Sequence, residues 1–374
     1  MNVFHCAACG NLLFFENTTC VSCQRTVAYL PDLVAVSSLE AAGDGTRTST
    51  DAAMTARYRL CQNYTTAQTC NRAVPVESDA AFCESCQLTE VIPDVSVPGT
   101  RESWYRLEVA KRRLFYTLQR LHLPLRSRTE DPVAGVAFRF LADPTPDDVG
   151  PAVLTGHDEG VITINIAEAD GVERERRRKE LHEPYRTVLG HMRHEIGHFY
   201  WDRLIRDTSE VEEFRRLFGD ERADYGAALE AHYANGAPAD WSARFISAYA
   251  SAHPWEDWAE TWAHYLHMFD TLETAAACGV SLRPKRKDEP SLPKAPDVST
   301  AKGVPFSRMV DSWFPLTYML NELNRGLGQA DAYPFVLAQP IIDKLAYVHD
   351  VIGRQGTRGP GLKEKREPAS AGPL

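Results

Sequence analysis

The apolar positions of this chain follow a helical spacing over most of its length beyond the first hundred residues. Between residues 102 and 123, tryptophan and leucine recur three, four or seven positions apart, which is typical of an amphipathic helix. The same pattern predicts further helices over 185–206, 219–235, 255–277, 306–325 and 340–352. Apolar and polar residues alternate over 133–141 and 161–166, which predicts two strands. We therefore expect an α+β fold, with a mostly helical domain over 100–353 that contains a small β-sheet.

The first hundred residues differ in composition, because every cysteine except Cys278 lies there. The cysteines fall into two segments, 1–36 and 56–99. The segment 37–55 between them is rich in serine, threonine, glycine and aspartate, which predicts a linker. At the other end, residues 354–374 are polar and rich in glycine and proline, which predicts a flexible tail. The sequence thus predicts two small cysteine-rich units before the large domain.

In residues 1–36 the cysteines form two Cys-x-x-Cys pairs. Such a pair places two sulfur atoms on one side of a tight turn, and two pairs together make a tetrahedron suited to zinc. A segment this short could hardly fold without a metal. We therefore predict a zinc ribbon that holds a structural zinc. Its ligands are Cys6, Cys9, Cys20 and Cys23.

Residues 56–99 carry a looser cluster, in which only the last two cysteines form a Cys-x-x-Cys pair. We predict a second structural zinc here, the alternative being thiols without a metal. The ligands would be Cys61, Cys70, Cys83 and Cys86. A zinc ion with four protein ligands has no open position for catalysis. The chain would therefore hold one or two structural zinc ions.

Charge and composition exclude several classes of protein. The net charge is −10 at pH 7, which disfavours nucleic-acid binding, since that binding draws on a positive surface. No apolar stretch reaches the roughly 18 residues that a membrane-spanning helix needs, and the start does not read as a secretory signal. We therefore expect a cytoplasmic protein. In that compartment, paired cysteines hold metal more often than they form disulfides.

The segment 185–206 contains the string His-Glu-Ile-Gly-His at positions 194–198. On a helix, His194 and His198 lie one turn apart on the same face, so both imidazoles can reach one zinc ion. Glu195 lies beside them, angled to hold the water on the metal. The sequence therefore predicts a catalytic zinc, with these histidines as ligands and Glu195 as the catalytic base. The competing interpretation is a helix whose two histidines have ordinary partners.

A catalytic zinc usually takes three protein ligands, and a later predicted helix offers the third. It starts at Pro254 and places Glu256 and Glu260 one turn apart on one face. One carboxylate could bind zinc while the other accepts the spare N–H of a ligand histidine. We take Glu256 as the ligand and Glu260 as the histidine's partner, with the reverse assignment left open. His264 and His267 are weaker ligand candidates.

Several longer strings are specific as well. They are RHEIGHFYWD at 193–202, FGDERADY at 218–225, HPWEDWAETWAH at 253–264, WFPLTY at 313–318 and YPFVL at 333–337. With the N-terminal zinc ribbon, these strings resemble the bacterial family of putative zinc-binding metallopeptidases, over nearly the whole chain. The third string is also similar to the third-ligand helix of gluzincin peptidases, where the first glutamate binds zinc. That resemblance implies Glu256 as the ligand, although Asp257 and Trp258 replace two aromatic residues.

The resemblance implies a zinc-dependent, gluzincin-like metallopeptidase with a zincin-like domain. It would hydrolyse peptide bonds with a zinc-bound water that Glu195 activates. Tyr225 and His232 are candidate donors to the oxyanion of the transition state. The strand 161–166 is the expected edge on which an extended peptide substrate pairs. The ribbons would dock substrates or a protein partner.

Two other interpretations remain open from the sequence. In one, the chain is a non-catalytic binding or regulatory protein with a zincin-like scaffold, and its ribbons bind a partner. In the other, it is a zinc hydrolase that acts on an amide other than a peptide. The intact Glu195 favours an enzyme, because a scaffold needs no base at that position.

Overall fold

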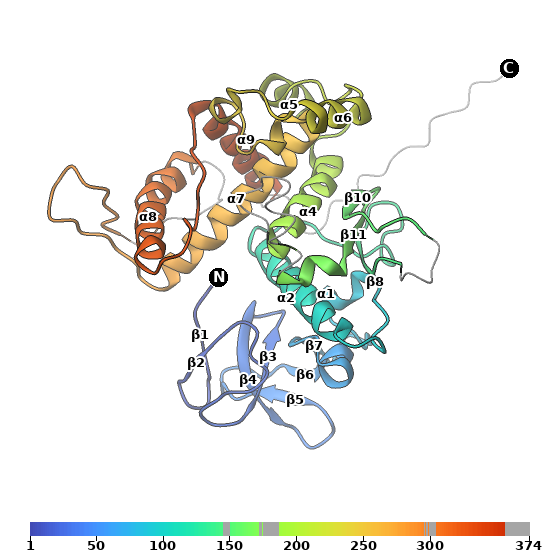
Figure 1. Cartoon of the computed structure of the whole chain (residues 1–374). Coiled ribbons are helices and arrows are strands. Elements are labelled where there is room, and N and C mark those ends of the chain that lie inside the picture. The colour runs from blue at the N-terminus through green and yellow to red at the C-terminus, as the bar shows by residue number, and fades with distance from the viewer. Residues whose placement is uncertain are drawn as a thin grey trace, which may run out of the picture.

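The structure is a computed structural model that describes residues 1–144, 150–171, 174, 187–294, 296, 298 and 304–355. The predicted tail lies almost wholly outside the described residues. A small β-rich module at the N-terminus lies below a larger, mostly helical body (Figure 1). The fold is therefore α+β with the cysteine-rich module first, as the sequence predicts.

The N-terminal module consists of short antiparallel strands. They are β1 (Phe4–His5), β2 (Leu12–Leu13), β3 (Thr26–Leu30), β4 (Ala35–Ala41), β5 (Arg47–Ser49), β6 (Arg57–Leu60) and β7 (Ala73–Pro75). The first two pair with each other, and β3 to β7 form one five-stranded sheet in sequence order. Two short helical turns complete the module, η1 (Asn63–Ala67) and α1 (Glu84–Gln87).

The prediction of a linker over 37–55 is wrong, because most of β4 and all of β5 lie in this segment. The hydroxyl residues that suggested a linker hydrogen-bond across the sheet instead. The Oγ atoms of Ser37 and Ser49 are 2.9 Å apart, and Ser38 Oγ is 2.6 Å from Thr50 Oγ1. Such cross-strand pairs stabilise a sheet. The two cysteine clusters therefore belong to one continuous module.

The body contains a second sheet of four strands, in the order β10-β11-β9-β8. The strands are β8 (Thr89–Val91), β9 (Ala137–Leu141), β10 (Gly156–Asp158) and β11 (Val161–Asn165). The predicted strand 161–166 forms β11, but the expectation that it is the edge is wrong. It lies between β9 and β10, and the antiparallel β10 forms that edge. β8 leads out of the cysteine-rich module and pairs with β9 of the body.

Seven longer helices are described in the body. They are α2 (Thr100–Arg120), α4 (Val188–Leu204), α5 (Val211–Phe218), α6 (Tyr225–Asn235), α7 (Pro254–Ala277), α8 (Ser307–Gly326) and α9 (Gln339–Gln355). The short turns between them are η2 (Ile166–Ala169), η3 (Trp241–Ala243) and η4 (Tyr249–Ser251). The predicted helix 219–235 starts later, at Tyr225. There the Asp224 side chain accepts a hydrogen bond from the N–H of Ala227, which caps α6.

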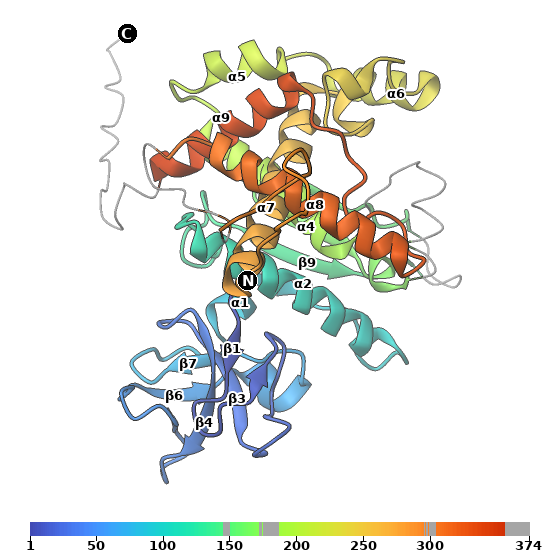
Figure 2. The same ribbon diagram turned by 90° about the vertical axis from the view of Figure 1, so that its left-hand side faces the viewer.

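Helix α2 joins the module to the body, because it lies across the module and also packs on α4 (Figure 2). On the module side, the ring of Tyr116 lies 5.6 Å from that of Phe15 and 6.4 Å from that of Tyr29. The hydroxyl of Tyr29 donates to Gln119 Oε1 over 2.9 Å. On the body side, Leu114 and other residues of α2 share one core with α4 and α7.

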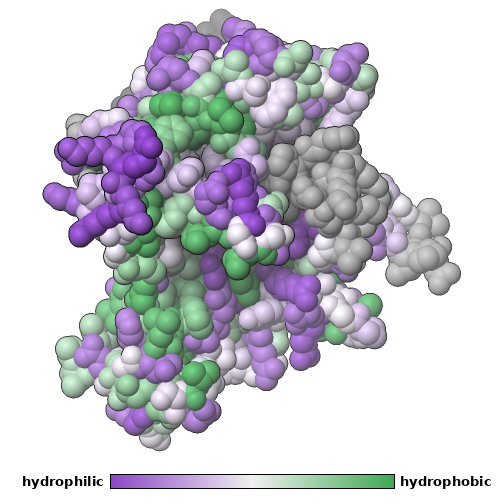
Figure 3. Space-filling model, turned by 60° about the vertical axis from the view of Figure 1, so that its left-hand side comes forward, coloured by the Kyte–Doolittle hydropathy of each residue, from purple (hydrophilic) through white to green (hydrophobic). Residues whose placement is uncertain are grey.

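The surface seen in Figure 3 mixes hydrophilic residues with smaller hydrophobic areas over both the module and the body. Within the described ranges, no helix is long and apolar enough to cross a membrane.

Candidate metal centre

Helix α4 carries the His-Glu-x-x-His motif and owes its start to a cap. The Thr187 side chain accepts a hydrogen bond from the N–H of Gly190 over 2.9 Å. Met192, Ile196 and Phe199 are buried in the body's core, which fixes the rotation of the helix. The motif histidines are thereby turned toward α7.

Helix α7 begins at Pro254, directly after the cap residue His253, whose Nδ1 accepts from the N–H of Trp255 over 3.1 Å. Glu256 therefore lies in the first turn. Gly197 of α4 allows close packing of the two helices, since a Cβ there would lie 3.1 Å from the Cα of Ala259. This close approach brings Glu256 to the motif histidines.

Three donor atoms meet between the two helices. The Nε2 atoms of His194 and His198 are 3.2 Å apart, and Glu256 Oε2 lies 3.0 Å from the first and 3.6 Å from the second. Glu256 is 1% exposed, and its Oε2 is buried without a hydrogen-bond partner among the described residues. Two imidazoles and one carboxylate at these distances can fill three coordination positions of a zinc ion and leave the fourth open.

A further set of contacts orients these three side chains. Glu260 Oε1 lies 2.7 Å from Nδ1 of His194, and the hydroxyl of Ser247 donates to Glu260 Oε2 over 2.7 Å. The hydroxyl of Tyr225 donates to Glu256 Oε1 over 2.6 Å. Such partners fix the tautomer of a ligand histidine and the orientation of a ligand carboxylate. The carboxylate of Glu256 thus lies among the donor atoms, whereas that of Glu260 contacts the far nitrogen of a ligand histidine.

The electrostatics of the group favour a positive charge at its centre. Burial acts to raise the pKa of Glu256, but the two imidazoles outweigh it, and the pKa lies well below its ordinary value. Burial also acts to raise the pKa of Glu260, but His194 outweighs it and lowers this pKa to about 2. Conversely, burial acts against the charge of His194, but Glu256 and Glu260 raise its pKa well above the ordinary value. Two carboxylates thus stay ionised in a buried place, which suits a bound cation.

Glu195, the predicted base, follows His194 on α4 and is 8% exposed. Its carboxylate makes no hydrogen bond to the residues that the structure describes, so it is available to a water molecule or a substrate. Burial first, and with it the negative charges of Glu256 and Glu195, raise the pKa of both Tyr225 and Tyr249. The motif thus supplies an unengaged carboxylate beside the donor atoms.

The other predicted candidates lie around this group in different ways. Tyr225 contacts Glu256, as described. His232 of α6 packs edge-on against the ring of Tyr249 at 6.0 Å. The two weaker ligand candidates are not in the group, since Nδ1 of His264 lies 2.9 Å from the hydroxyl of Tyr333, and His267 also packs near this tyrosine.

Three side chains that lie near the motif histidines were not predicted from the sequence. The ring of Trp255 lies 4.0 Å from that of His198, and His157 of β10 stacks on the same imidazole at 6.2 Å. Burial lowers the pKa of His157 to about 3, so this side chain is neutral. The third is Tyr249, whose ring lies 6.0 Å from that of His194. Trp255 adjoins Glu256 in the sequence, but nothing there links His157 or Tyr249 to the motif.

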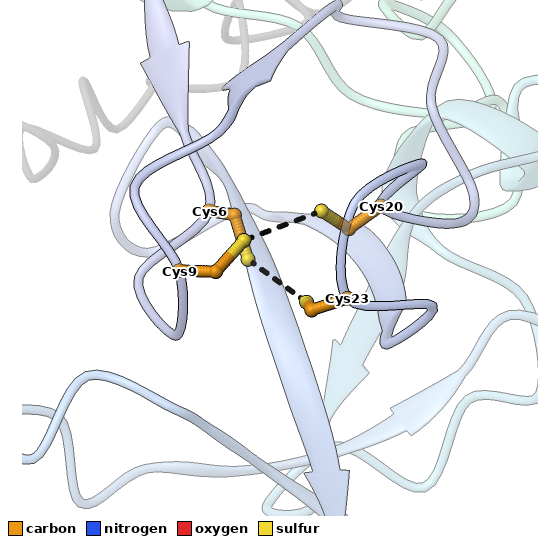
Figure 4. A group of neighbouring side chains, drawn as sticks. All are labelled: Cys6, Cys9, Cys20 and Cys23. Carbon is orange, nitrogen blue, oxygen red and sulfur yellow. Dashed lines mark hydrogen bonds between the residues drawn. The ribbon is translucent and has the colours of Figure 1, made fainter.

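The first cysteine cluster has the geometry of a zinc site. Sγ of Cys6 lies 3.6 Å from that of Cys23, and Sγ of Cys9 lies 3.7 Å from that of Cys20 (Figure 4). In a tetrahedral site with a Zn–S distance of about 2.3 Å, sulfur atoms lie about 3.8 Å apart. Gly10, with φ of +75°, closes the first turn. The four predicted residues therefore form one ligand set.

The second cluster is also assembled, despite its irregular spacing. Sγ of Cys70 lies 3.7 Å from that of Cys83, and the N–H of Cys83 donates to Sγ of Cys61 over 3.3 Å. These three and Cys86 are buried, and their sulfur atoms lie within 4.8 Å of one another. All eight cysteines are free thiols. Both clusters therefore fit a zinc ion with four thiolate ligands.

Comparison with known proteins places both parts of the chain in described families. A family described as "Putative zinc-binding metallo-peptidase" matches residues 100–351, and a zinc-ribbon domain matches residues 3–97. Uncharacterised proteins of Mycobacterium bovis and Mycobacterium tuberculosis are each 43% identical over 355 residues, which covers 94% of this chain and 95% of theirs. No solved structure matches the chain. The chain therefore belongs to the family of putative zinc-binding metallopeptidases and carries a zinc-ribbon domain at its N-terminus.

Proposed function

We propose that this protein is a zinc-dependent peptidase whose catalytic centre consists of His194, His198, Glu256 and Glu195. The observation that carries the proposal is the pairing of an assembled donor set with a carboxylate, Glu195, that has no partner among the described residues. A purely structural zinc site would be closed by a fourth protein ligand. It would also have no use for an unengaged base beside it.

Each side chain has a distinct task in the hydrolysis of a peptide bond. A zinc ion between the two helices would supply Lewis-acid chemistry, lowering the pKa of water and polarising the scissile carbonyl. Glu195 takes the proton from the attacking water and passes it to the leaving amine. Glu260 holds the imidazole of His194 in the tautomer that leaves Nε2 free, and Tyr225 orients the carboxylate of Glu256.

The substrate class that we propose is an extended peptide that pairs with the edge strand β10. This strand carries His157 next to His198, and its outer edge has no strand neighbour among the described residues. An extended chain adds to such an edge through main-chain hydrogen bonds. The scissile bond of a peptide bound there would lie next to the metal centre.

The experiment that tests the proposal compares the wild type with Glu195→Gln on a mixture of unstructured peptides, analysed by mass spectrometry. We expect the wild type to cleave peptides, and the variant to be at least about a hundredfold slower, because a positioned base contributes about that much or more. Zinc content should be equal in both, because Glu195 is not in the donor set. Cleavage at the same rate by the variant, or none by the zinc-loaded wild type, would contradict the proposal.

A further inference from the structure

Tyr249 has an unusual position next to the metal centre. It starts the short turn η4 between α6 and α7, and its ring lies 6.0 Å from the ring of His194 and 6.0 Å from that of His232. Its side chain is partly exposed, and its hydroxyl makes no hydrogen bond to any residue that the structure describes. The ring of Tyr249 thus lies beside those of two histidines, and its hydroxyl, without a partner among the described residues, is available to a ligand.

The backbone around Tyr249 is anchored to the metal centre itself. The N–H of Ala250 donates to the hydroxyl oxygen of Ser247 over 3.1 Å, and this hydroxyl donates in turn to Glu260 Oε2 over 2.7 Å. Glu260 also holds His194. The turn that carries Tyr249 is therefore fixed to the same carboxylate that orients a ligand histidine, so the backbone of this turn is held in place before any substrate binds.

The other two candidate donors are less suitable than Tyr249. The hydroxyl of Tyr225 already donates to Glu256, and turning it toward a substrate would release the carboxylate that it orients. The ring of His232 packs against the rings of Tyr233 and Tyr249 and makes no ring contact with the motif histidines among the described residues. Tyr249 is thus the tyrosine near His194 with a hydroxyl not engaged by the described residues.

We propose that the hydroxyl of Tyr249 donates a hydrogen bond to the oxyanion that forms during peptide hydrolysis, and that Tyr225 is a positioning residue for Glu256. The inference rests on the proposed function. As the water oxygen bonds to the carbonyl carbon, the electron pair of the C=O bond moves to its oxygen, and Tyr249 hydrogen-bonds to that oxygen without giving up its proton. When the C–N bond breaks, the carbonyl re-forms and the proton from Glu195 goes to the amine.

The ordinary chemistry of a phenol suits this role. A tyrosine hydroxyl has a pKa of about 10, so it carries its proton near neutral pH and can donate a hydrogen bond. Removing one preorganised donor of this kind typically lowers kcat by about a hundred- to a thousandfold.

The test has one arm that needs no substrate. Inorganic phosphate, a tetrahedral anion, and azide, a linear one, are titrated calorimetrically into the zinc-loaded wild type and Tyr249→Phe. His194→Ala, which lacks the metal centre, gives the background. We expect the variant to keep the zinc content and the azide affinity of the wild type, but to bind phosphate at least about tenfold more weakly. Equal phosphate affinity in both proteins, or none in the wild type, would overturn the inference.

The second arm is kinetic and uses a peptide that the wild type cleaves. Tyr249→Phe should lower kcat and leave KM almost unchanged, whereas Tyr225→Phe should lower the affinity for zinc. Tyr233→Phe is the matched control, since this tyrosine is 64% exposed on α6, and it should behave as the wild type. A wild type that cleaves nothing would overturn the proposed function, and the phosphate titration would still decide the role of Tyr249. A variant as fast as an active wild type would overturn only the present inference.

Discussion

At the scale of the residue, the geometry of the metal centre depends on the partners that orient the ligand side chains as much as on the ligands themselves. Glu260 accepts from His194 on one oxygen and from Ser247 on the other, so it leaves this imidazole a single orientation. His198 has no such partner, and its Nδ1 is buried without a hydrogen bond among the described residues. Its ring is fixed instead by packing against the tilted ring of Trp255 and by stacking on His157.

Replacing Glu260 with glutamine should therefore weaken zinc binding without abolishing it. We expect the zinc affinity to fall about ten- to a hundredfold, the usual cost of losing such an outer partner. Competition with a chelator of known affinity measures it. Ser247→Ala, which removes only the hydroxyl behind Glu260, should have a smaller effect. An affinity as low as that of Glu256→Ala would show that Glu260 is itself the ligand.

His264 should make the stability of the protein depend on pH. Burial lowers its pKa to about 4, against about 6.5 in an unfolded chain, so the unfolded state binds more protons between these values. The free energy of unfolding should thus fall as the pH drops from 7 to 5, by about 2 kcal/mol from this group. Urea titrations at both pH values should show a smaller drop for His264→Gln. An equal drop in the free energy of unfolding of the wild type and His264→Gln would show that His264 does not cause this pH dependence.

At the scale of the element, the centre is the contact between α4 and α7. The helical pattern around residues 194–198 and the proline at the start of the later helix were sufficient to predict the faces that meet. The sequence did not show that β4 and β5 cross the supposed linker, because the pairing of their serines across the sheet cannot be seen in the sequence. The position of Tyr249 was not predictable either, since it depends on a short turn whose anchor, Ser247 to Glu260, joins distant positions.

Gly197→Ala tests how closely the two helices must pack. The added methyl group would lie 3.1 Å from the Cα of Ala259 and 3.2 Å from the Cβ of Trp262, so the helices must move apart. We expect a loss of about 1–3 kcal/mol in the free energy of unfolding, together with weaker zinc binding. Gly226→Ala on α6 is the control, because its new contact is an ordinary 3.6 Å and its stability should not fall. Equal stability and equal zinc affinity of the two variants would show that the close packing at Gly197 is not required.

At the scale of the whole molecule, the zinc-ribbon module is part of the support of the candidate metal centre. Its core includes Tyr116 of α2, and the next helix in contact with α2 is α4. The fully buried guanidinium of Arg72 lies between the rings of Tyr29, at 4.1 Å, and Phe115, at 4.7 Å. Module and body should therefore lose their structure together.

Cys70→Ser should show this coupling, because it removes one ligand of the buried second cluster. All tryptophans lie beyond the module, from Trp104 onward, so their fluorescence reports on the body alone. We expect the variant to lose one zinc ion and its tryptophan transition to move to a lower temperature. Cys278→Ser, at an exposed thiol outside both clusters, should leave both quantities unchanged. An unmoved tryptophan transition in Cys70→Ser would show that the module is independent.

The central claim is that α4 and α7 together form a third zinc site besides the two cysteine clusters. The most direct measurement is the zinc content per chain of the wild type, Glu256→Ala and Glu195→Gln by atomic emission. We expect three zinc ions in the wild type, two in Glu256→Ala and three in Glu195→Gln. Two zinc ions in the wild type, or three in Glu256→Ala, would contradict this claim.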